Sequence, residues 1–244
     1  MRFNQNRWGE VSGNQIIATE GPAGRPSGEK FSLEQVELLA PVEPSKIVCV
    51  GRNYAAHIRE LHGFGEELPK EPGLFLKGPN TVTSSGSQIP YPDFTAEFHY
   101  EGELAVVLKD RLYKASEAEV QAAILGYTCA FDLTARDKQR QDLQWVRAKS
   151  ADLFCPVGPW LETELDLSQA QLATYLNGEL RQQATFDQMI FKVPQILSYI
   201  SGFMTLEPGD LVLTGTPEGV GTLSRGDRLE LTITGIGTLA VSIS

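Results

Sequence analysis

The chain has 244 residues, 41% of them hydrophobic and 21% charged, which is ordinary for a globular protein that buries a substantial core. Its formal net charge of -10 argues against a nucleic-acid partner, because phosphate binding needs a concentrated basic surface. Three cysteines without C-x-x-C spacing, no apolar N-terminal signal and no bilayer-spanning apolar run predict a reduced, cytoplasmic protein without a membrane partner.

The first 42 residues predict a small N-terminal β domain. Short β-prone pieces alternate there with turn signals, such as residues 12–14 and the Gly/Pro-rich residues 21–28. Pro41 and Pro44 make a stiff connection to the main domain, which we expect over residues 43–244. Strands recur in that domain without regular intervening helices. The predicted fold is therefore mixed α/β and dominated by β strands, not a doubly wound sheet.

A short helix is predicted after the apolar strand 47–50. Asn53 is suited to cap its first turn, and we expect the helix to run to about residue 61 and to end at Gly63. His57 and Glu60 share one face of this helix, where the carboxylate can orient the imidazole as a general base. A solvated surface pair is the alternative. The charged residues 62–73 predict a loop, either a lid over bound substrate or a plain surface excursion.

Residues 98–107 predict one buried strand with two carboxylates, Glu101 and Glu103, on the same face. Asp132 ends the apolar strand 124–132, and functional side chains are common at strand ends. Three carboxylates in apolar surroundings suit a hard ion such as Mg²⁺, Mn²⁺ or Ca²⁺. A solvated acidic strand face is the alternative. His99 shares the face of the two glutamates, and we expect it to pack or to support the site without binding the ion.

The second half of the chain contains several local signals. Ser116 and Glu119 form a capping box for a helix to about residue 123, and residues 172–181 predict a hairpin with an Asn-Gly turn. A helix is predicted over residues 193–201, a strand over 211–214 and a closing hairpin over 228–242. The glycine-rich loop around Thr216 lacks the G-K-[ST] ending of a nucleotide-binding loop and fits a small carboxylate better. Lys149, without further information, is typical of a surface residue.

Five motifs follow one another in the chain: G-R-N-Y at residues 51–54, E-x-E at 101–103, F-D-L-T-A-R-D at 131–137, A-K-S at 148–150 and T-G-T-P-E-G-V-G at 214–221. From about Val42 to the C-terminus the chain thereby resembles the fumarylacetoacetate hydrolase family. It is most similar to the small acylpyruvase and oxaloacetate decarboxylase branch, because His57 and Glu60 follow G-R-N-Y. The resemblance implies a β-roll catalytic domain, a homodimer and a small 2-oxo or 2,4-dioxo acid as substrate.

The resemblance also implies roles for individual residues. It makes Glu101, Glu103 and Asp132 the metal ligands, and His57, Glu60 and Lys149 the catalytic residues. Substrate binding falls to Arg52, Tyr54, Arg136, Gln139, Gly215 and Thr216. Arg136 could equally fix its own loop by pairing with Asp137 or Asp142.

The implied activity is Mg²⁺- or Mn²⁺-dependent cleavage of the C–C bond of acylpyruvates, such as acetylpyruvate and fumarylpyruvate, to pyruvate and a carboxylic acid. Oxaloacetate decarboxylation and oxaloacetate keto–enol tautomerisation remain open, because both pass through the same enolate. Isomerisation or decarboxylation of unsaturated dioxo acids in aromatic catabolism is a further alternative. The non-enzymatic alternative is a β-rich protein with a structural Ca²⁺ site.

Overall fold

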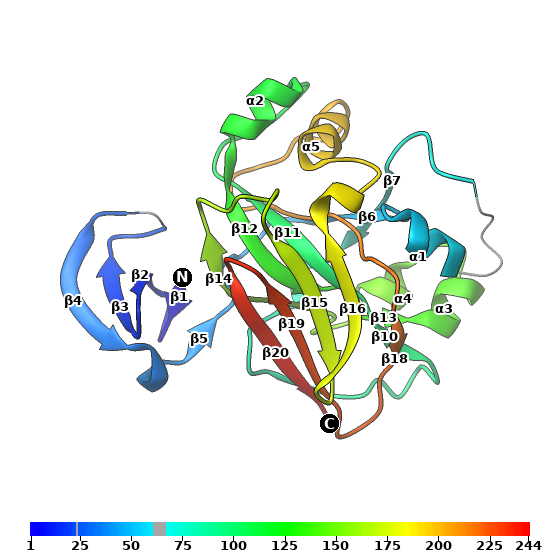
Figure 1. Cartoon of the computed structure of the whole chain (residues 1–244), viewed down its shortest axis with the longest axis horizontal. Helices are drawn as coiled ribbons and strands as arrows, with labels where there is room; N and C mark the ends of the chain where they lie inside the picture. The colour runs from blue at the N-terminus through cyan, green and yellow to red at the C-terminus, as the bar shows by residue number, and fades with distance from the viewer. Residues whose placement is uncertain (23, 61–66) are drawn as a thin grey trace.

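Strands form most of the regular structure of residues 1–22, 24–60 and 67–244, which are the residues that the computed structural model describes (Figure 1). The predicted mixed fold dominated by β strands is confirmed, as is the small β domain at the N-terminus. No helix in the described part of the chain has the length and apolar character needed to cross a bilayer.

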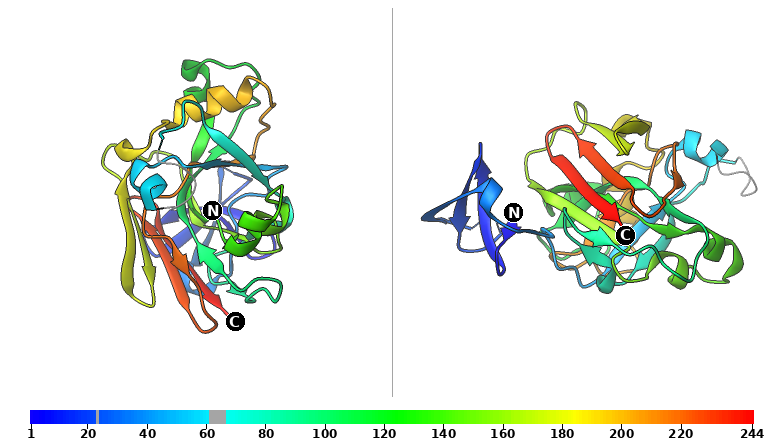
Figure 2. Two further views of the ribbon diagram at one scale, coloured as in Figure 1. Left: turned by 90° about the vertical axis from the view of Figure 1, so that its right-hand side faces the viewer. Right: turned by 90° about the horizontal axis from the view of Figure 1, so that it is seen from below.

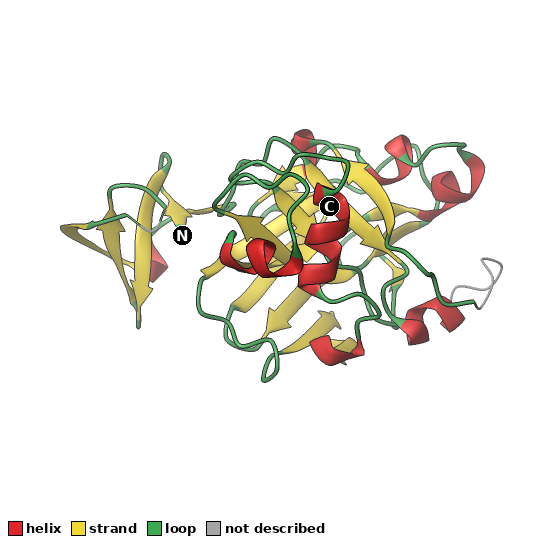
Figure 3. Ribbon diagram, turned by 90° about the horizontal axis from the view of Figure 1, so that it is seen from above, coloured by secondary structure: helices red, strands yellow, loops and turns green. Residues whose placement is uncertain are grey.

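The N-terminal domain is one antiparallel sheet in the order β4-β3-β2-β1-β5. Its strands are β1 (Arg2–Phe3), β2 (Arg7–Ser12), β3 (Gln15–Thr19), β4 (Pro26–Ser32) and β5 (Leu38–Leu39), with a 3-10 turn at Leu33–Gln35. Phe3, Ile16 and Ala18 form its own small core. A side chain at Gly9 would place its Cβ 2.4 Å from Ile16 Cγ2, so only glycine fits there. This sheet lies to one side of the main body (Figures 2 and 3).

Two larger sheets build the main domain. The seven-stranded sheet has the order β7 (Gly73–Lys77), β6 (Ile47–Gly51), β17 (Leu211–Leu213), β11 (Gly102–Leu108), β12 (Ile124–Phe131), β14 (Cys155–Glu162) and β8 (Val82–Thr83). The five-stranded sheet has the order β16 (Glu179–Thr185), β15 (Gln171–Leu176), β19 (Arg228–Ile233), β20 (Gly237–Ile243) and β9 (Gln88–Ile89). A small third sheet joins β13 (Thr134–Ala135), β10 (Phe98–Tyr100) and β18 (Gly221–Thr222).

Alternation along β11 places side chains in two separate clusters. Leu104 and Val106 belong to the main core, together with Leu229 and Leu231 of the five-stranded sheet. Ala105 and Val107 belong to a second cluster, which also contains residues of β6, β14 and β17. Glu103 lies on the same face of β11 as Ala105. One face of this buried strand therefore carries the glutamate, and the side chains of the other face pack into the main core.

Five helices lie in the described part of the chain: α1 (Ala55–Glu60), α2 (Glu117–Ala122), α3 (Arg136–Gln141), α4 (Val146–Lys149) and α5 (Val193–Ser201). Single 3-10 turns occupy Pro79–Thr81 and Phe186–Gln188. Figure 1 shows α2 and α5 together at the top of the main domain, and α1, α3 and α4 on the right. The capping box of Ser116 and Glu119, the Asn-Gly hairpin and the closing hairpin are all confirmed.

Three local predictions differ from the structure. Asn53 does not cap α1, which begins at Ala55; the Asn53 side chain instead bonds the backbone of Phe191 and Thr214. Residues 98–107 are not one strand, because the chain leaves β10 at Glu101 and joins a different sheet as β11. Helix α3 was not among the predicted elements. The expected helix end at Gly63 and the first part of the 62–73 loop lie outside the described residues.

Candidate active site

A small pocket of about 50 Å³ lies at the end of the main domain that carries α1, α3 and α4. Its lining consists of Val50, Gly51, Arg52, His57, Phe75, Glu101, Glu103, Arg136, Gln139, Trp145, Lys149 and Thr216. Most of the side chains that the motifs single out therefore meet in one place, from segments far apart in the sequence. Four predicted site residues are outside this lining: Tyr54, Glu60, Asp132 and Gly215.

Glu101, Glu103 and Asp132 form one buried cluster, with one oxygen of each within 4.8 Å of the others. The pairing of β11 with β12 brings them together, since Gly102 lies opposite Phe131 and the Asp132 amide donates to the Glu101 carbonyl at 2.9 Å. Such an all-oxygen, buried donor set fits a hard divalent cation. The solvated acidic face considered from the sequence is wrong, because the three side chains are buried.

His99 lies apart from this cluster, as expected. Its Nε2 pairs with the Thr222 hydroxyl at 3.2 Å, and no grouping of potential metal ligands in the described residues includes it. Burial and the nearby Arg136 lower the pKa of His99 to about 4, so the ring is neutral at physiological pH.

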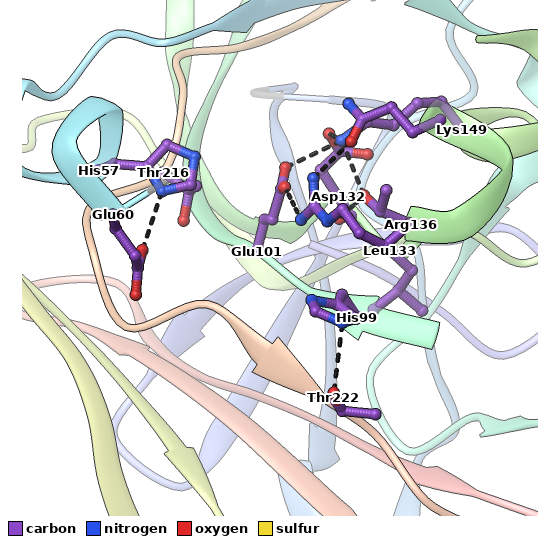
Figure 4. Close-up of polar contacts among 12 residues, drawn as sticks. His57, Glu60, His99, Glu101, Asp132, Leu133, Arg136, Lys149, Thr216 and Thr222 are labelled. Atoms are coloured by element: carbon purple, nitrogen blue, oxygen red, sulfur yellow. Dashed lines mark hydrogen bonds and ion pairs between the residues drawn. The ribbon is translucent and has the colours of Figure 1, made fainter. Parts of the chain in front are cut away.

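Lys149 lies between two of the carboxylates (Figure 4). Its ammonium donates to Glu101 Oε2 at 2.9 Å, to Asp132 Oδ2 and to the Thr134 hydroxyl at 2.7 Å, and it lies 4.9 Å from the Phe75 ring centre. Burial lowers the pKa of Lys149, but Asp132 and Glu101 outweigh burial and raise it overall. A surface role is excluded by its burial.

Sequence reasoning missed a second buried ammonium, that of Lys77. Lys77 Nζ donates to Asp132 Oδ1 and, at 3.2 Å, to the Leu133 carbonyl. The only signal was a lysine two residues after Phe75 in an apolar strand, which places the two side chains on one face of β7. No role was predicted for this lysine.

Arg136 opens α3 and pairs with Glu101 and with Gln139 Oε1, the latter at 2.6 Å. The alternative pairing with Asp137 or Asp142 is wrong, because Lys138 and Arg147 take those carboxylates. Arg136 and Gln139 both line the pocket.

The pKa values of the two glutamates shift in opposite directions. Burial raises the pKa of Glu101, but Lys149 and Arg136 outweigh it and hold that pKa well below its usual value. Burial and repulsion from Asp132 and Glu101 raise the pKa of Glu103 well above its usual value. The Gly215 amide, which donates to Glu103 at 2.6 Å, only partly offsets this. Glu103 is thus the member of the cluster that a divalent cation would stabilise most.

His57 and Glu60 form the predicted dyad. His57 Nδ1 is 3.2 Å from Glu60 Oε2, and Glu60 Oε1 accepts from the Gly219 amide at 3.0 Å. Burial raises the pKa of Glu60, but hydrogen bonds from His57 and Gly219 outweigh burial and lower it. The surface-pair alternative is wrong, because His57 is buried and lines the pocket. With Nδ1–H donated to the carboxylate, Nε2 carries the lone pair that faces the pocket.

Two further predicted residues, Gly215 and Thr216, belong to the glycine-rich loop. The Thr216 hydroxyl donates to the Gly102 carbonyl at 2.9 Å and accepts from Gln182 Nε2 at 2.7 Å, a partner that the sequence analysis did not identify. Gly215 has φ +96°, and a Cβ there would lie 2.8 Å from Asn53 Cβ. Its amide donates a hydrogen bond to Glu103 and is therefore not available to a ligand in the pocket.

Arg52 and Tyr54 follow β6. Arg52 lines the pocket with φ +60° and donates to the Glu67 carbonyl at 3.3 Å. The Tyr54 hydroxyl is buried, with no hydrogen-bond partner in the described part of the chain, and the ring lies outside the pocket lining.

Comparisons with known proteins identify the relatives of this chain. A family model described as fumarylacetoacetate (FAA) hydrolase C-terminal matches residues 46–244, and one described as Rv2993c-like, N-terminal matches residues 2–41. The mitochondrial oxaloacetate tautomerase of Bos taurus is 43% identical over 78% of this chain and 87% of its own length.

Two solved structures share the fold. A 5-carboxymethyl-2-hydroxymuconate delta-isomerase from Mycobacterium smegmatis is 39% identical, with a TM-score of 0.88 over 100% of this chain and 98% of its own. Fumarylpyruvate hydrolase from Pseudomonas aeruginosa, solved with Mn²⁺ and pyruvate, is 33% identical, with a TM-score of 0.77 over 89% and 92%. The match of the family model to residues 46–244 and the similarity of these relatives lead to one conclusion: the chain belongs to the fumarylacetoacetate hydrolase family.

Proposed function

We propose that this protein is a metal-dependent enzyme that catalyses the keto–enol tautomerisation of oxaloacetate or a similarly small 2-oxo dicarboxylic acid. One observation carries the proposal: a buried histidine, His57, whose Nδ1 lies beside a carboxylate, lines the same pocket as Glu101 and Glu103 of the buried carboxylate cluster. Tautomerisation requires only proton transfer next to a carbonyl group. A histidine base together with a metal ion held by the carboxylates can perform this transfer. A relative 43% identical that is named an oxaloacetate tautomerase supports the choice.

Glu101, Glu103 and Asp132 are the residues that would hold Mg²⁺ or Mn²⁺. When bound, such an ion polarises the 2-oxo group and makes the hydrogens on the adjacent carbon more acidic. The Mn²⁺ in the structure of fumarylpyruvate hydrolase supports this assignment.

His57 takes a proton from the carbon next to the 2-oxo group through Nε2, and Glu60 stabilises the imidazolium that results. The proton is then returned to the oxygen of the former carbonyl, so the C–H bond is exchanged for an O–H bond and no water is consumed. Lys149, Arg136 and Arg52 line the pocket and balance the negative charge of the substrate.

Acylpyruvate hydrolysis, with acetylpyruvate or fumarylpyruvate as substrate, is the second candidate. His57 would then take its proton from water, and the hydroxide would attack the acyl carbonyl. The similarity to a fumarylpyruvate hydrolase supports this reading. We place it second because the fumarylpyruvate hydrolase is 33% identical to this chain, whereas the oxaloacetate tautomerase of Bos taurus is 43% identical.

The test compares activities with and without metal. Protein stripped with EDTA and reloaded with Mg²⁺ or Mn²⁺ is mixed with enol-oxaloacetate, and loss of the enol absorbance is followed; we expect metal-dependent acceleration, abolished by EDTA. Pyruvate release from acetylpyruvate and from oxaloacetate is measured in parallel, and turnover of unsaturated dioxo acids by absorbance. Faster metal-dependent release of pyruvate from acetylpyruvate would reverse the order of the two candidates. Stabilisation by Ca²⁺ without turnover of any 2-oxo acid would support the structural-site alternative.

A further inference from the structure

Each carboxylate of the cluster has one oxygen bound by a donor from the surrounding structure. The three pairs are Glu101 Oε1 with Arg136, Glu103 Oε2 with the Gly215 amide, and Asp132 Oδ1 with Lys77. The second oxygens of Glu101 and Asp132 meet instead at Lys149, on the side of the pocket. Each carboxylate is thus anchored through one oxygen, and the second oxygens of Glu101 and Asp132 share the ammonium of Lys149, which lines the pocket.

Lys77 differs from the other cations of the site in its location. It is 1% exposed and is absent from the pocket lining, whereas Lys149 and Arg136 both belong to that lining. Its ammonium donates two hydrogen bonds, one to Asp132 and one to the Leu133 carbonyl, and lies 6.0 Å from the Phe154 ring centre. The pairing of β7 with β6 fixes its backbone. Lys77 therefore does not line the pocket itself and is connected to the carboxylate cluster through Asp132.

We propose that Lys77 is a positioning residue, which holds Asp132 Oδ1 and so presents Oδ2 alone to a divalent ion. The inference rests on the proposed metal-dependent function. A carboxylate without such a partner can turn about its Cβ–Cγ bond and offer both oxygens, as carboxylates often do to larger cations. An ammonium on a rigid strand prevents that turn, in the way that outer-shell hydrogen bonds orient ligands in metal sites.

The number of oxygens that the protein supplies decides how much of the ion remains for substrate. Mg²⁺ and Mn²⁺ prefer octahedral oxygen coordination, so three carboxylates that give one oxygen each leave about three positions open. A 2-oxo acid needs two of these for its carboxylate and its carbonyl oxygen. If Asp132 supplied both oxygens, about two positions would remain, and the substrate would fill them without room for a water molecule.

The test counts the water molecules on bound Mn²⁺ by the magnetic-field dependence of water-proton relaxation, a measurement that needs no turnover. We expect about three for the wild-type protein and about two for Lys77→Met, in which Asp132 is free to turn. Lys46→Met is the matched control, because Lys46 also pairs with a buried aspartate, Asp210, remote from the pocket. That variant should retain the wild-type count even if it is less stable.

A second measurement uses the wild-type protein alone, in case Lys77→Met fails to fold. The ¹⁵Nζ–H signals of the buried lysines are recorded with and without Mg²⁺. We expect the Lys77 signal to persist with little change, because Oδ1 is not a metal ligand, and the Lys149 signal to shift strongly.

The outcomes separate the two levels of the proposal. Wild-type protein that binds no Mn²⁺ overturns the metal-dependent function, and the role of Lys77 with it. Wild-type protein that binds Mn²⁺ while Lys77→Met shows the same water count overturns the role of Lys77 and leaves the proposed function standing. If Mg²⁺ shifts the Lys77 signal as strongly as the Lys149 signal, the role of Lys77 is likewise overturned and the proposed function stands.

Discussion

Glu60 uses both oxygens of its carboxylate, one on the His57 imidazole and one on the Gly219 amide. The bond to the glycine-rich loop fixes the position of the carboxylate, and the carboxylate in turn fixes the tautomer of the histidine. Gly219 has φ +95°, and a Cβ on it would lie 2.0 Å from the Arg181 carbonyl oxygen, so no other residue can present this amide. The base of the proposed reaction therefore depends on a glycine far away in the sequence.

Glu60→Gln tests this dependence. The amide oxygen of glutamine can still accept from Gly219, but its NH₂ group then faces His57 Nδ1. The ring would carry its proton on Nε2, and the nitrogen that faces the pocket would no longer be a base. We expect kcat to fall by roughly a hundredfold to a thousandfold, with a thermal unfolding midpoint close to that of the wild type. Glu97→Gln, which changes an exposed carboxylate paired with Arg140, is the control; equal kcat values for the two variants would contradict the role of Glu60.

The contrast between Glu60 and Lys77 shows what the sequence can reveal at this scale. His57 and Glu60 were predictable because their spacing on a helix is a local property. Lys77 was not, because its neighbours in sequence, Gly78 and Pro79, are equally typical of an exposed strand end. Its burial arises only when β7 pairs with β6 and the segment after β12 closes over it. No pattern within one strand contains that information.

At the scale of elements, Asp210 joins the starts of two parallel strands that lead to the pocket. It is fully buried and accepts from the Ser45 hydroxyl at 2.6 Å, the Lys46 amide at 3.2 Å, the Lys46 ammonium and the Glu207 amide at 2.7 Å. It thereby aligns β6 with β17, whose pairing begins at Ile47 and Leu211. Burial raises the pKa of Asp210, but Lys46, Ser45 and the Glu207 amide outweigh burial and lower it.

Asp210→Asn should lower the free energy of unfolding by about 2 kcal/mol at neutral pH, because an amide NH₂ would face the two donors that Oδ2 now accepts. The pKa of Asp210 is lower in the folded state than in the unfolded state. Its contribution to stability is therefore fully present above the unfolded-state pKa of about 4, and it is lost as the pH falls through the folded-state pKa. The difference between variant and wild type should therefore shrink at acidic pH. Urea unfolding at neutral and acidic pH measures it, with Asp110→Asn as an exposed control; a pH-independent difference would contradict the account.

Elements whose signals are local were predicted well, and those that tertiary contacts define were not. The capping box at Ser116 and the Asn177-Gly178 turn, with φ 55° and 83°, follow from the conformational preferences of a few adjacent residues. Asn53 has the chemistry of a helix cap, but two distant backbone segments compete for its side chain and win. The break at Glu101 is likewise invisible in sequence, because both halves of the apparent strand are β-prone and buried.

At the scale of the whole molecule, the N-terminal sheet and the catalytic domain have separate cores. Phe3, Ile16 and Ala18 pack among themselves, and none belongs to the two clusters of the main domain. The connection includes the Arg2–Glu43 ion pair, in which the Glu43 side chain is largely exposed, and a hydrogen bond from Arg2 to the Ala40 carbonyl at 3.0 Å. Val42, by contrast, packs with Ile47 in the second cluster of the main domain.

A truncated chain of residues 42–244 should therefore fold and retain its site. Every residue that lines the pocket lies between Val50 and Thr216, and the cluster of carboxylates makes no contact with the N-terminal sheet in the described residues. Truncation removes the Arg2–Glu43 ion pair. An ion pair with an exposed partner contributes about 1 kcal/mol or less to the free energy of unfolding, so its loss should lower the unfolding midpoint of a chain of this size by about 3 °C. Circular dichroism during heating and enol-oxaloacetate turnover with Mg²⁺ measure the two quantities against the full-length protein. Loss of cooperative unfolding, or loss of turnover at an unchanged midpoint, would show that the N-terminal sheet shapes the site and does not merely adjoin it.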